Sequence, residues 1–520
     1  MNRDEMIGRL RERREPWDVL VVGGGATGAG VAVDAASRGY AVALVERHDF
    51  GKGTSSRSTK LIHGGVRYLR RGNIALVRNA LRERARLRRN APHLVHDLPF
   101  IVPCYRWWER AYYGLGLKLY DVLAGRHGFD PSRRLPRDAT IERLPTLKPD
   151  GLRGGVTYHD GQFDDARLLI NLVQTACEHG AAAANYVRVT ALTKDATGRV
   201  TGATAVDEET GEALTLGAKV VVNATGPFSD AVRRMDQPDA AAMIAPSQGA
   251  HVVLDRSFLP GDAALIVPRT PDGRVLFAIP WHGRTLVGTT DTPTNDTPAE
   301  PRPTREEIAF ILETAGRYLL RRPTGSDVLS TFAGIRPLVK AGEAAKTSAL
   351  SRDHVIAVSA SGLVTIAGGK WTTYRRMAED AVDRAAGIAG LPRKRCVTAN
   401  LPIHGCVEGG DEDGALRRYG SDAAAVRALI SSDPSWSQPL APGLPFVLGE
   451  AAWATRHETA RTVEDVLARR TRVLHLDARA AIRAAPGVAS ILADELGRDQ
   501  AWQTEQVSAF TALARAYLPQ

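Results

Sequence analysis

Residues 17–46 read WDVLVVGGGATGAGVAVDAASRGYAVALVE, and this stretch decides the fold. Residues 17–22 form a short apolar run of the kind found in strands, and residues 31–38 have a helical pattern. A second apolar run, residues 41–45, predicts another strand and ends at the acidic Glu46. The order strand, glycine-rich turn, helix, strand and acid predicts a dinucleotide-binding unit within an α/β fold.

The glycines of the turn have the GxGxxG spacing, each with a separate physical role. Gly23 permits the tight turn after the strand, and Gly25 lets a diphosphate approach the backbone. Gly28 lets the helix pack close to the strand, and the N-terminus of that helix faces the phosphates. Glu46 is placed to accept a hydrogen bond from a ribose hydroxyl.

Three later stretches indicate that the dinucleotide carries a flavin. Residues 54–68, TSSRSTKLIHGGVRY, supply hydroxyls and a glycine pair that can complete a diphosphate site and pass beside an isoalloxazine ring. Residues 220–227, VVVNATGP, predict a buried strand that ends in a small-residue turn. Residues 362–374, GLVTIAGGKWTTY, predict a strand, a glycine pair and a helix whose N-terminus, with Lys370, can face the electron-rich edge of the reduced flavin.

Together, these motifs resemble those of the FAD-dependent glycerol-3-phosphate dehydrogenase family, among the glutathione-reductase-like, D-amino-acid-oxidase-type flavoproteins. The resemblance covers nearly the whole chain. It includes QGAHVV at residues 248–253, GIRP at residues 334–337 and TVEDVLARRTR at residues 462–472.

The resemblance implies a discontinuous glutathione-reductase-like FAD-binding domain, an antiparallel-sheet substrate domain and a helical C-terminal cap domain. A helix is expected over residues 164–179 and a strand over residues 185–189, with helices at 423–430, 450–457, 478–483 and 501–517. The expected domain ranges are 1–90, 160–230 and 350–395 for FAD, 91–159 and 231–349 for substrate, and 396–520 for the cap.

The resemblance also implies the reaction: sn-glycerol 3-phosphate is oxidised to dihydroxyacetone phosphate by hydride transfer from C2 to N5 of a non-covalently bound FAD. The expected substrate ligands are Arg67, Tyr68, His251, Arg336, Arg352 and Lys370. The expected catalytic residues are Arg336, His251, His63 and Lys370, and the proton acceptor stays open among His63, His251 and Lys370. Expected cofactor contacts are Gly23, Gly25, Gly28, Glu46, Thr54, Ser55, Ser56, Lys60, Leu61, His63, Gly64, Gly65, Ala224, Gly226, Gly369, Lys370, Thr372 and Thr373.

The family passes electrons to membrane quinone, which implies a peripheral protein on the inner, cytoplasmic face of the plasma membrane. Residues 106–120, RWWERAYYGLGLKLY, mix interfacial aromatics with cations and are too short to span a bilayer. The alternative is a helix packed in the substrate domain. A basic helix is expected over residues 78–89, with Ile74, Val77 and Leu81 pointing inward. Its cationic outer face can assist contact with the membrane.

Composition and charge exclude several other classes of protein. The 520 residues are 44% hydrophobic and 24% charged, which excludes disorder and predicts two or three domains. The charged residues 1–15 do not resemble a signal peptide. The net charge of +10 suits an anionic membrane surface, whereas no RNP or zinc-knuckle motif predicts nucleic-acid binding. The four cysteines, which lack CxxC spacing and should be free thiols without a metal site, are Cys104, Cys177, Cys396 and Cys406.

Two enzymatic alternatives remain open: a glycerol-3-phosphate oxidase that uses oxygen, and a related FAD-dependent amino-acid oxidase. A non-catalytic flavin-binding or nucleic-acid-binding protein is a third, and the arginine, histidine and lysine candidates argue against it. The sequence decides neither the electron acceptor nor whether the protein forms a homodimer.

Overall fold

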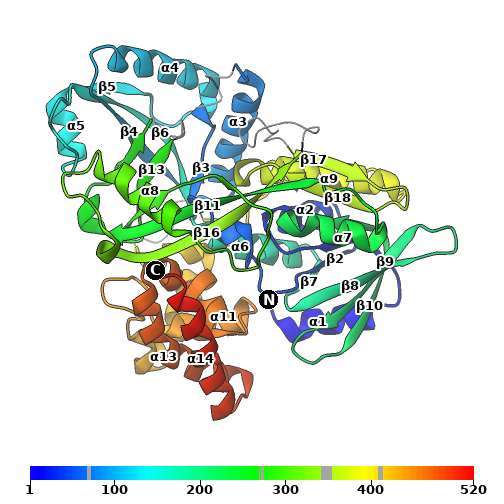
Figure 1. The fold of residues 1–520 in the computed structure, drawn as a ribbon. Coiled ribbons are helices and arrows are strands. Elements are labelled where there is room, and N and C mark those ends of the chain that lie inside the picture. The colour runs from blue at the N-terminus through cyan, green and yellow to red at the C-terminus, as the bar shows by residue number, and fades with distance from the viewer. Residues whose placement is uncertain are drawn as a thin grey trace.

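A computed structural model describes residues 1–66, 69, 72–268, 270, 275–340, 354–407 and 414–519 (Figure 1). Three predicted substrate ligands, Arg67, Tyr68 and Arg352, lie outside the described residues.

The first sheet contains the predicted dinucleotide-binding unit. Its central strand β1 runs parallel to both β2 and β10, and β10 runs parallel to β18, with the order β17-β18-β10-β1-β2-β7. Strand β9 pairs with both β10 and β8 in an antiparallel extension. The strands are β1 (Trp17–Val22), β2 (Val42–Val45), β7 (Ala182–Ala184), β8 (Val187–Lys194), β9 (Val200–Asp207), β10 (Ala213–Asn223), β17 (His354–Val358) and β18 (Val364–Gly368).

Helices cover this sheet, and α2 packs against both α6 and α9. The predicted helix over 164–179 is confirmed as α6, which Asp164 caps by accepting from the backbone of Ala166 and Arg167. The predicted strand over 185–189 is confirmed only over residues 187–189, the start of β8, because Tyr186 has a left-handed φ of 56° that separates β7 from β8. The helices are α1 (Arg3–Glu12), α2 (Ala26–Ser37), α6 (Asp165–Glu178), α7 (Ser229–Asp236) and α9 (Tyr374–Ile388).

The second sheet has the order β15-β11-β14-β13-β12-β4-β6-β3, with β16 paired to β11 and β5 to β6. It is antiparallel as expected, except that β12 runs parallel to β4. Strand β3 joins it by pairing with β6, so the polypeptide crosses between the two sheets at this point. The strands are β3 (Leu61–Ile62), β4 (Val95–Cys104), β5 (Arg133–Leu135), β6 (Gly154–Phe163), β11 (Ile244–Asp255), β12 (Ala264–Val267), β13 (Leu276–Trp281), β14 (Arg284–Gly288), β15 (Thr292–Pro293) and β16 (Val328–Val339).

Helices also border the second sheet. The basic helix α3 buries Val77 and Leu81 as predicted, but Ile74 is exposed because it is the first residue of the helix. The four helices are α3 (Ile74–Asn90), α4 (Glu109–Ala124), α5 (Arg137–Arg143) and α8 (Arg305–Gly316).

The C-terminal part is helical, as predicted, and lies against the second sheet (Figure 1). One hydrophobic cluster continues from Trp281 and Phe332 of the sheet to Val463 and Leu474 of the helical part, so the two share a core. The helices are α10 (Ala423–Ser431), α11 (Gly449–His457), α12 (Val473–Leu476), α13 (Ala478–Leu496) and α14 (Gln500–Arg515), and a π-helical turn at Asp465–Arg470 lies between α11 and α12.

Buried ion pairs connect this turn to the first sheet. The carboxylate of Asp49, four residues beyond β2, accepts hydrogen bonds from Arg469 Nε at 2.5 Å and from Arg470 Nη1 at 2.8 Å. All three residues are buried. Burial alone would raise the pKa of Asp49, but the two guanidinium groups hold that pKa below its usual value. The carboxylate is therefore charged and shared between the two arginines.

We expect Asp49→Asn to lower the free energy of unfolding by about 3–5 kcal/mol, because two buried guanidinium groups lose their common counter-charge. Urea unfolding measures the loss. The control is Glu208→Gln, which breaks the exposed ion pair with Arg188 and should cost less than about 1 kcal/mol. Equal losses in the two variants would contradict the buried-pair interpretation.

Candidate active site

The turn between β1 and α2 has the geometry that the glycine motif predicts. Gly23 has a φ of 107°, and a Cβ on Gly28 would lie 1.8 Å from the Gly23 carbonyl oxygen. Gly25 is the N-cap of α2 and gives the helix no capping side chain. The amide of Ala26 donates instead to Ser55 Oγ at 2.9 Å. The first turn of α2 therefore presents backbone donors beside a hydroxyl-rich segment.

Glu46 lies at the end of β2, where the motif requires an acid. Its carboxylate accepts from the amide of Gly24 at 2.6 Å and from that of His48 at 2.9 Å. Burial raises the pKa of Glu46 in spite of these hydrogen bonds. The side chain is thus fixed beside the glycine turn, and its contact with ribose stays a prediction.

Three stretches distant in the sequence meet next to this turn. The indole Nε1 of Trp371 donates to the carbonyl of Ser55 at 2.9 Å, and Thr54 Oγ1 donates to the carbonyl of Ile335 at 2.5 Å. Thr372 Oγ1 lies 3.5 Å from the carbonyl oxygen of His63. The predicted cofactor segment, the glycine-pair turn and strand β16 are therefore brought together.

Lys60 is fully buried and bonded to protein groups. Its ammonium group donates to Asp165 Oδ2 and to the Ser56 carbonyl, both at 2.7 Å. Burial and the nearby Arg472 lower the pKa of Lys60 to about 7, although Asp165 opposes the shift. The side chain holds residues 56–60 in place, and direct contact with a cofactor stays a prediction.

His251 lies on β11, 2% exposed, and is stacked on Phe332 with ring centroids 4.8 Å apart. Its Nε2 is hydrogen-bonded to Thr59 Oγ1 at 2.9 Å, and its buried Nδ1 has no hydrogen-bond partner among the described residues. Burial, with Lys60 and Arg336 nearby, lowers the pKa of His251 well below its usual value. The imidazole is therefore neutral near pH 7.

Arg336 lies on β16, which pairs with β11 along most of its length. Its guanidinium donates to the Thr290 carbonyl at 2.9 Å and to Thr289 Oγ1 at 3.1 Å, and it pairs with Asp291 at 3.3 Å. It crosses β11 at Gly249, where an added Cβ would lie 2.4 Å from Nη2. The small residues of the QGAHVV stretch thus make room for the arginine.

His63 and Lys370 lie on two turns that contact each other through Thr372. Both residues are partly exposed, but the Nζ atom of Lys370 is buried. The amide of Gly64 donates to Tyr120 Oη at 2.8 Å, and Tyr120 donates to Asp160 at 2.9 Å. Asp160 is in turn paired with the buried Arg84. This buried network fixes the turn that follows His63.

The other predicted cofactor residues lie on the same segments. Ala224 follows β10, and its carbonyl oxygen is 2.8 Å from the position of a Cβ on Gly23. Positive φ angles at Gly65, Gly226 and Gly369 make sharp turns there. Ser56 and Thr54 lie in the turn Thr54–Ser56, Leu61 in β3, and Thr373 with Thr372 in the turn Trp371–Thr373.

Sequence reasoning missed the residues that hold these segments. Thr59, Asp165, Tyr120 and Asp160 each contact a predicted site residue, yet none was expected to. Only Thr59 had a local signal, because it lies in the hydroxyl-rich stretch. The other three act across separations of 40 to 105 residues.

These residues fit a dinucleotide: a side-chain-free turn, an uncapped helix N-terminus and an acid after β2. We expect Gly25→Val to abolish FAD binding, because an added Cβ would lie 3.0 Å from Ser55 Oγ and the branched side chain would occupy the space that the motif assigns to the diphosphate. The ratio of flavin to protein absorbance measures the loss. The control is Gly387→Val on α9, where an added Cβ meets nothing within 4 Å. A Gly25→Val protein that purifies yellow would refute the assignment.

Comparisons with known proteins agree with this geometry. A family model described as FAD dependent oxidoreductase matches residues 18–375, and one described as C-terminal domain of alpha-glycerophosphate oxidase matches residues 396–503. The chain is 45% identical to a mitochondrial glycerol-3-phosphate dehydrogenase of Arabidopsis thaliana, over 95% of this chain and 85% of that protein. A human mitochondrial glycerol-3-phosphate dehydrogenase is 42% identical over 94% of this chain and 72% of its own length.

A solved structure is similar over the whole chain. The glycerol-3-phosphate dehydrogenase of Bacillus halodurans, complexed with FAD, matches with a TM-score of 0.81 at 32% identity, covering 99% of this chain and 98% of that one. With a family model spanning most of the chain and relatives of this identity, the protein belongs to the FAD-dependent glycerol-3-phosphate dehydrogenase family.

Proposed function

We propose that this enzyme oxidises sn-glycerol 3-phosphate at C2 and passes the electrons to membrane quinone. The observation that carries the proposal is the convergence of His251 and Arg336 with the segment Thr54–Ser56 and the turn Trp371–Thr373. When non-covalently bound, FAD supplies the hydride acceptor. The protein groups bind the phosphate, orient C2 and remove the hydroxyl proton.

Arg336 is the phosphate or oxygen ligand in this proposal. Its guanidinium is planar and its side chain is 27% exposed, so a phosphate could form two parallel hydrogen bonds to it by replacing some of its present partners. Thr289, Thr290 and Asp291 fix its orientation before substrate arrives. Arg67, Tyr68 and Arg352 are proposed to complete the substrate site.

The proton acceptor is His63 or Lys370 in this proposal, and His251 is a neutral substrate ligand. Protonation of His251 would place a charge on a fully buried ring that already faces Lys60 and Arg336. His63 and Lys370 stay candidates because they lie on the two turns that meet at Thr372. The His63 side chain is partly exposed, whereas the Nζ atom of Lys370 is buried.

We expect Arg336→Lys to reduce the rate of anaerobic flavin reduction by glycerol 3-phosphate about 10- to 150-fold, because lysine keeps the charge but loses the planar fork. Stopped-flow absorbance measures the rate, and FAD content should stay at the wild-type level. Arg256→Lys, at an exposed ion pair with Asp262, is the control. Wild-type reduction by the Arg336 variant would make this arginine purely structural.

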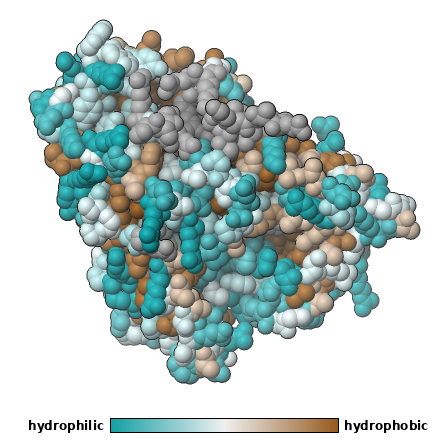
Figure 2. Space-filling view, viewed as in Figure 1, coloured by the Kyte–Doolittle hydropathy of each residue, from teal (hydrophilic) through white to brown (hydrophobic). Residues whose placement is uncertain are grey.

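Helix α4 supports contact with a membrane surface. Its inner face buries Gly114, Leu117, Tyr120 and Ala124. Its outer face exposes an apolar stripe at helical spacing, and Figure 2 shows apolar side chains protruding along that edge of the molecule. The apolar stripe consists of Tyr112, Leu115, Leu119 and Val122. Trp107, which precedes the helix, is 82% exposed.

The described helices include none that is both long and apolar enough to cross a bilayer. Attachment in this proposal is therefore peripheral, on the cytoplasmic face of the plasma membrane. Arg106, Arg110 and Lys118 lie beside the stripe and are exposed, which suits anionic lipid.

We expect the wild type to co-sediment with phosphatidylglycerol vesicles at low salt, and high salt to weaken the binding. Trp107→Ser with Leu115→Ser should weaken it further and leave substrate-driven flavin reduction unchanged. Leu320→Ser, at an exposed leucine away from the stripe, should bind as the wild type does. Wild type that stays in the supernatant at low salt would contradict peripheral attachment.

A second candidate function is a glycerol-3-phosphate oxidase that reduces oxygen. This candidate is supported by the match of residues 396–503 to a C-terminal domain named for alpha-glycerophosphate oxidase. Turnover with oxygen compared with turnover on a soluble quinone analogue separates the two.

A further inference from the structure

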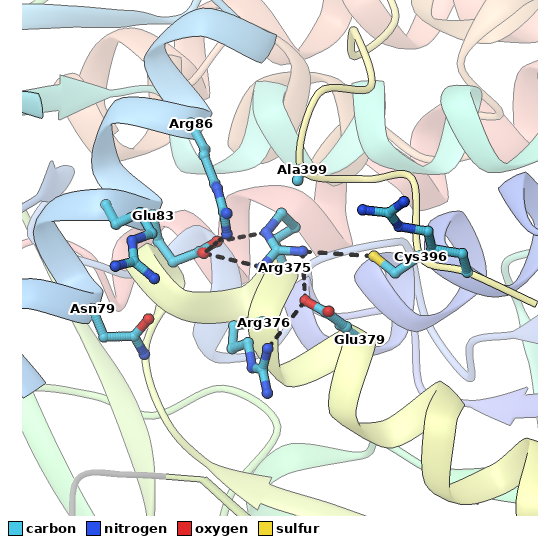
Figure 3. A pocket seen from close by; sticks show the side chains of 10 residues that line it. Asn79, Glu83, Arg86, Arg375, Arg376, Glu379, Cys396 and Ala399 are labelled. Atoms are coloured by element: carbon cyan, nitrogen blue, oxygen red, sulfur yellow. Dashed lines mark hydrogen bonds and ion pairs between the residues drawn. The ribbon is translucent and has the colours of Figure 1, made fainter.

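A cavity of about 540 Å³ lies between α3, α9 and the segment after α9, apart from the candidate active site (Figure 3). Its ten lining residues include five arginines and two glutamates, so its walls carry a surplus of three positive charges. Neither the proposed reaction nor the proposed membrane contact uses these residues.

The floor of the cavity is a rigid ion-pair framework. Arg375 is buried, and its Nε and Nη2 donate to the two carboxylate oxygens of Glu83 at 2.6 and 3.0 Å. Its Nη1 donates to Glu379 at 2.9 Å, and Arg86 also pairs with Glu83. Although burial opposes it, hydrogen bonds to Glu83 raise the pKa of Arg375. Figure 3 shows Arg375 between Glu83 and Glu379, with dashed lines to both.

Both glutamates of the cavity are already paired with arginines, and further arginines lie at its rim. Glu83 and Glu379 each accept from two arginines, and Arg376 is also paired with Asp380. Arg82 and Arg395 are exposed and have no acidic partner among the residues that the structure describes. Guanidinium groups gathered around a concave surface repel one another and attract an anion.

We propose that this cavity binds a small hydrophilic anion that carries phosphate, of the diphosphate or phosphomonoester class. Guanidinium groups form paired, charge-assisted hydrogen bonds with phosphate oxygens. The volume suits a small molecule. Of the lining residues, only Cys396 and Ala399 are apolar, which favours a soluble anion over an acyl chain.

Calorimetry with inorganic pyrophosphate tests the proposal. The titration uses the FAD-loaded protein with saturating dihydroxyacetone phosphate, so that the main site does not take up the probe. We expect one pyrophosphate per chain, and about tenfold weaker binding after Arg82→Gln with Arg395→Gln. The matched control is Arg78→Gln with Arg393→Gln, which removes the same charge from exposed arginines that do not line the cavity.

Two results would overturn the proposal. One is no pyrophosphate binding by the wild type beyond the main site. The other is an equal loss of affinity in the two double variants, which would indicate general charge attraction without a built site. Glycerophosphoglycerol, the headgroup of phosphatidylglycerol without its acyl chains, is the second titrant. Weaker binding than pyrophosphate is expected, because glycerophosphoglycerol is a phosphodiester with a single negative charge. Tighter binding would point to a lipid headgroup and contradict the proposed class of anion.

Discussion

The candidate site depends on one buried carboxylate, that of Asp165 at the start of α6. Its Oδ2 accepts from the amide and hydroxyl of Ser58, at 3.0 and 2.7 Å, and from Lys60 Nζ at 2.7 Å. Its Oδ1 accepts from Arg472 at 3.1 Å. A charge at this depth is stable only while its partners remain. With these partners in place, Asp165 fixes residues 58–60, of which Thr59 is hydrogen-bonded to His251. Through Arg472, Asp165 also joins this segment to the C-terminal helical part.

Features within one short stretch of sequence could be predicted. Contacts between residues far apart in the sequence could not. The glycine turn and Glu46 are close in sequence, and glycines at GxGxxG spacing followed by an acid after the next strand form a recognisable pattern. Asp165 and Asp160 have no such signature, because a carboxylate in a helix or strand is ordinary until folding brings an arginine to it. The break at Tyr186 was missed for a related reason: its positive φ occurs without a glycine to mark it.

Several arginines of this basic chain form buried ion pairs. Arg84, Arg167, Arg470 and Arg472 are among the largest fully buried side chains, and each is paired with an acid from another part of the molecule. These residues join the sheets and helices and add nothing to the surface potential. Because each is matched by an acid, these pairs are neutral and leave the net charge of +10 to the other residues.

Helix α4 connects the candidate site to the surface within one helix diameter, about 10 Å. Tyr120 on its inner face donates to Asp160 and accepts from Gly64, and so fixes the turn after His63. Leu115 and Val122 on its outer face are 72% and 75% exposed. In the proposed reaction the electrons pass to a lipid-soluble acceptor, and that transfer would need the reactive centre close to the face that meets the lipid. A helix that supports the site on one side and exposes an apolar stripe on the other meets that requirement without spanning the bilayer.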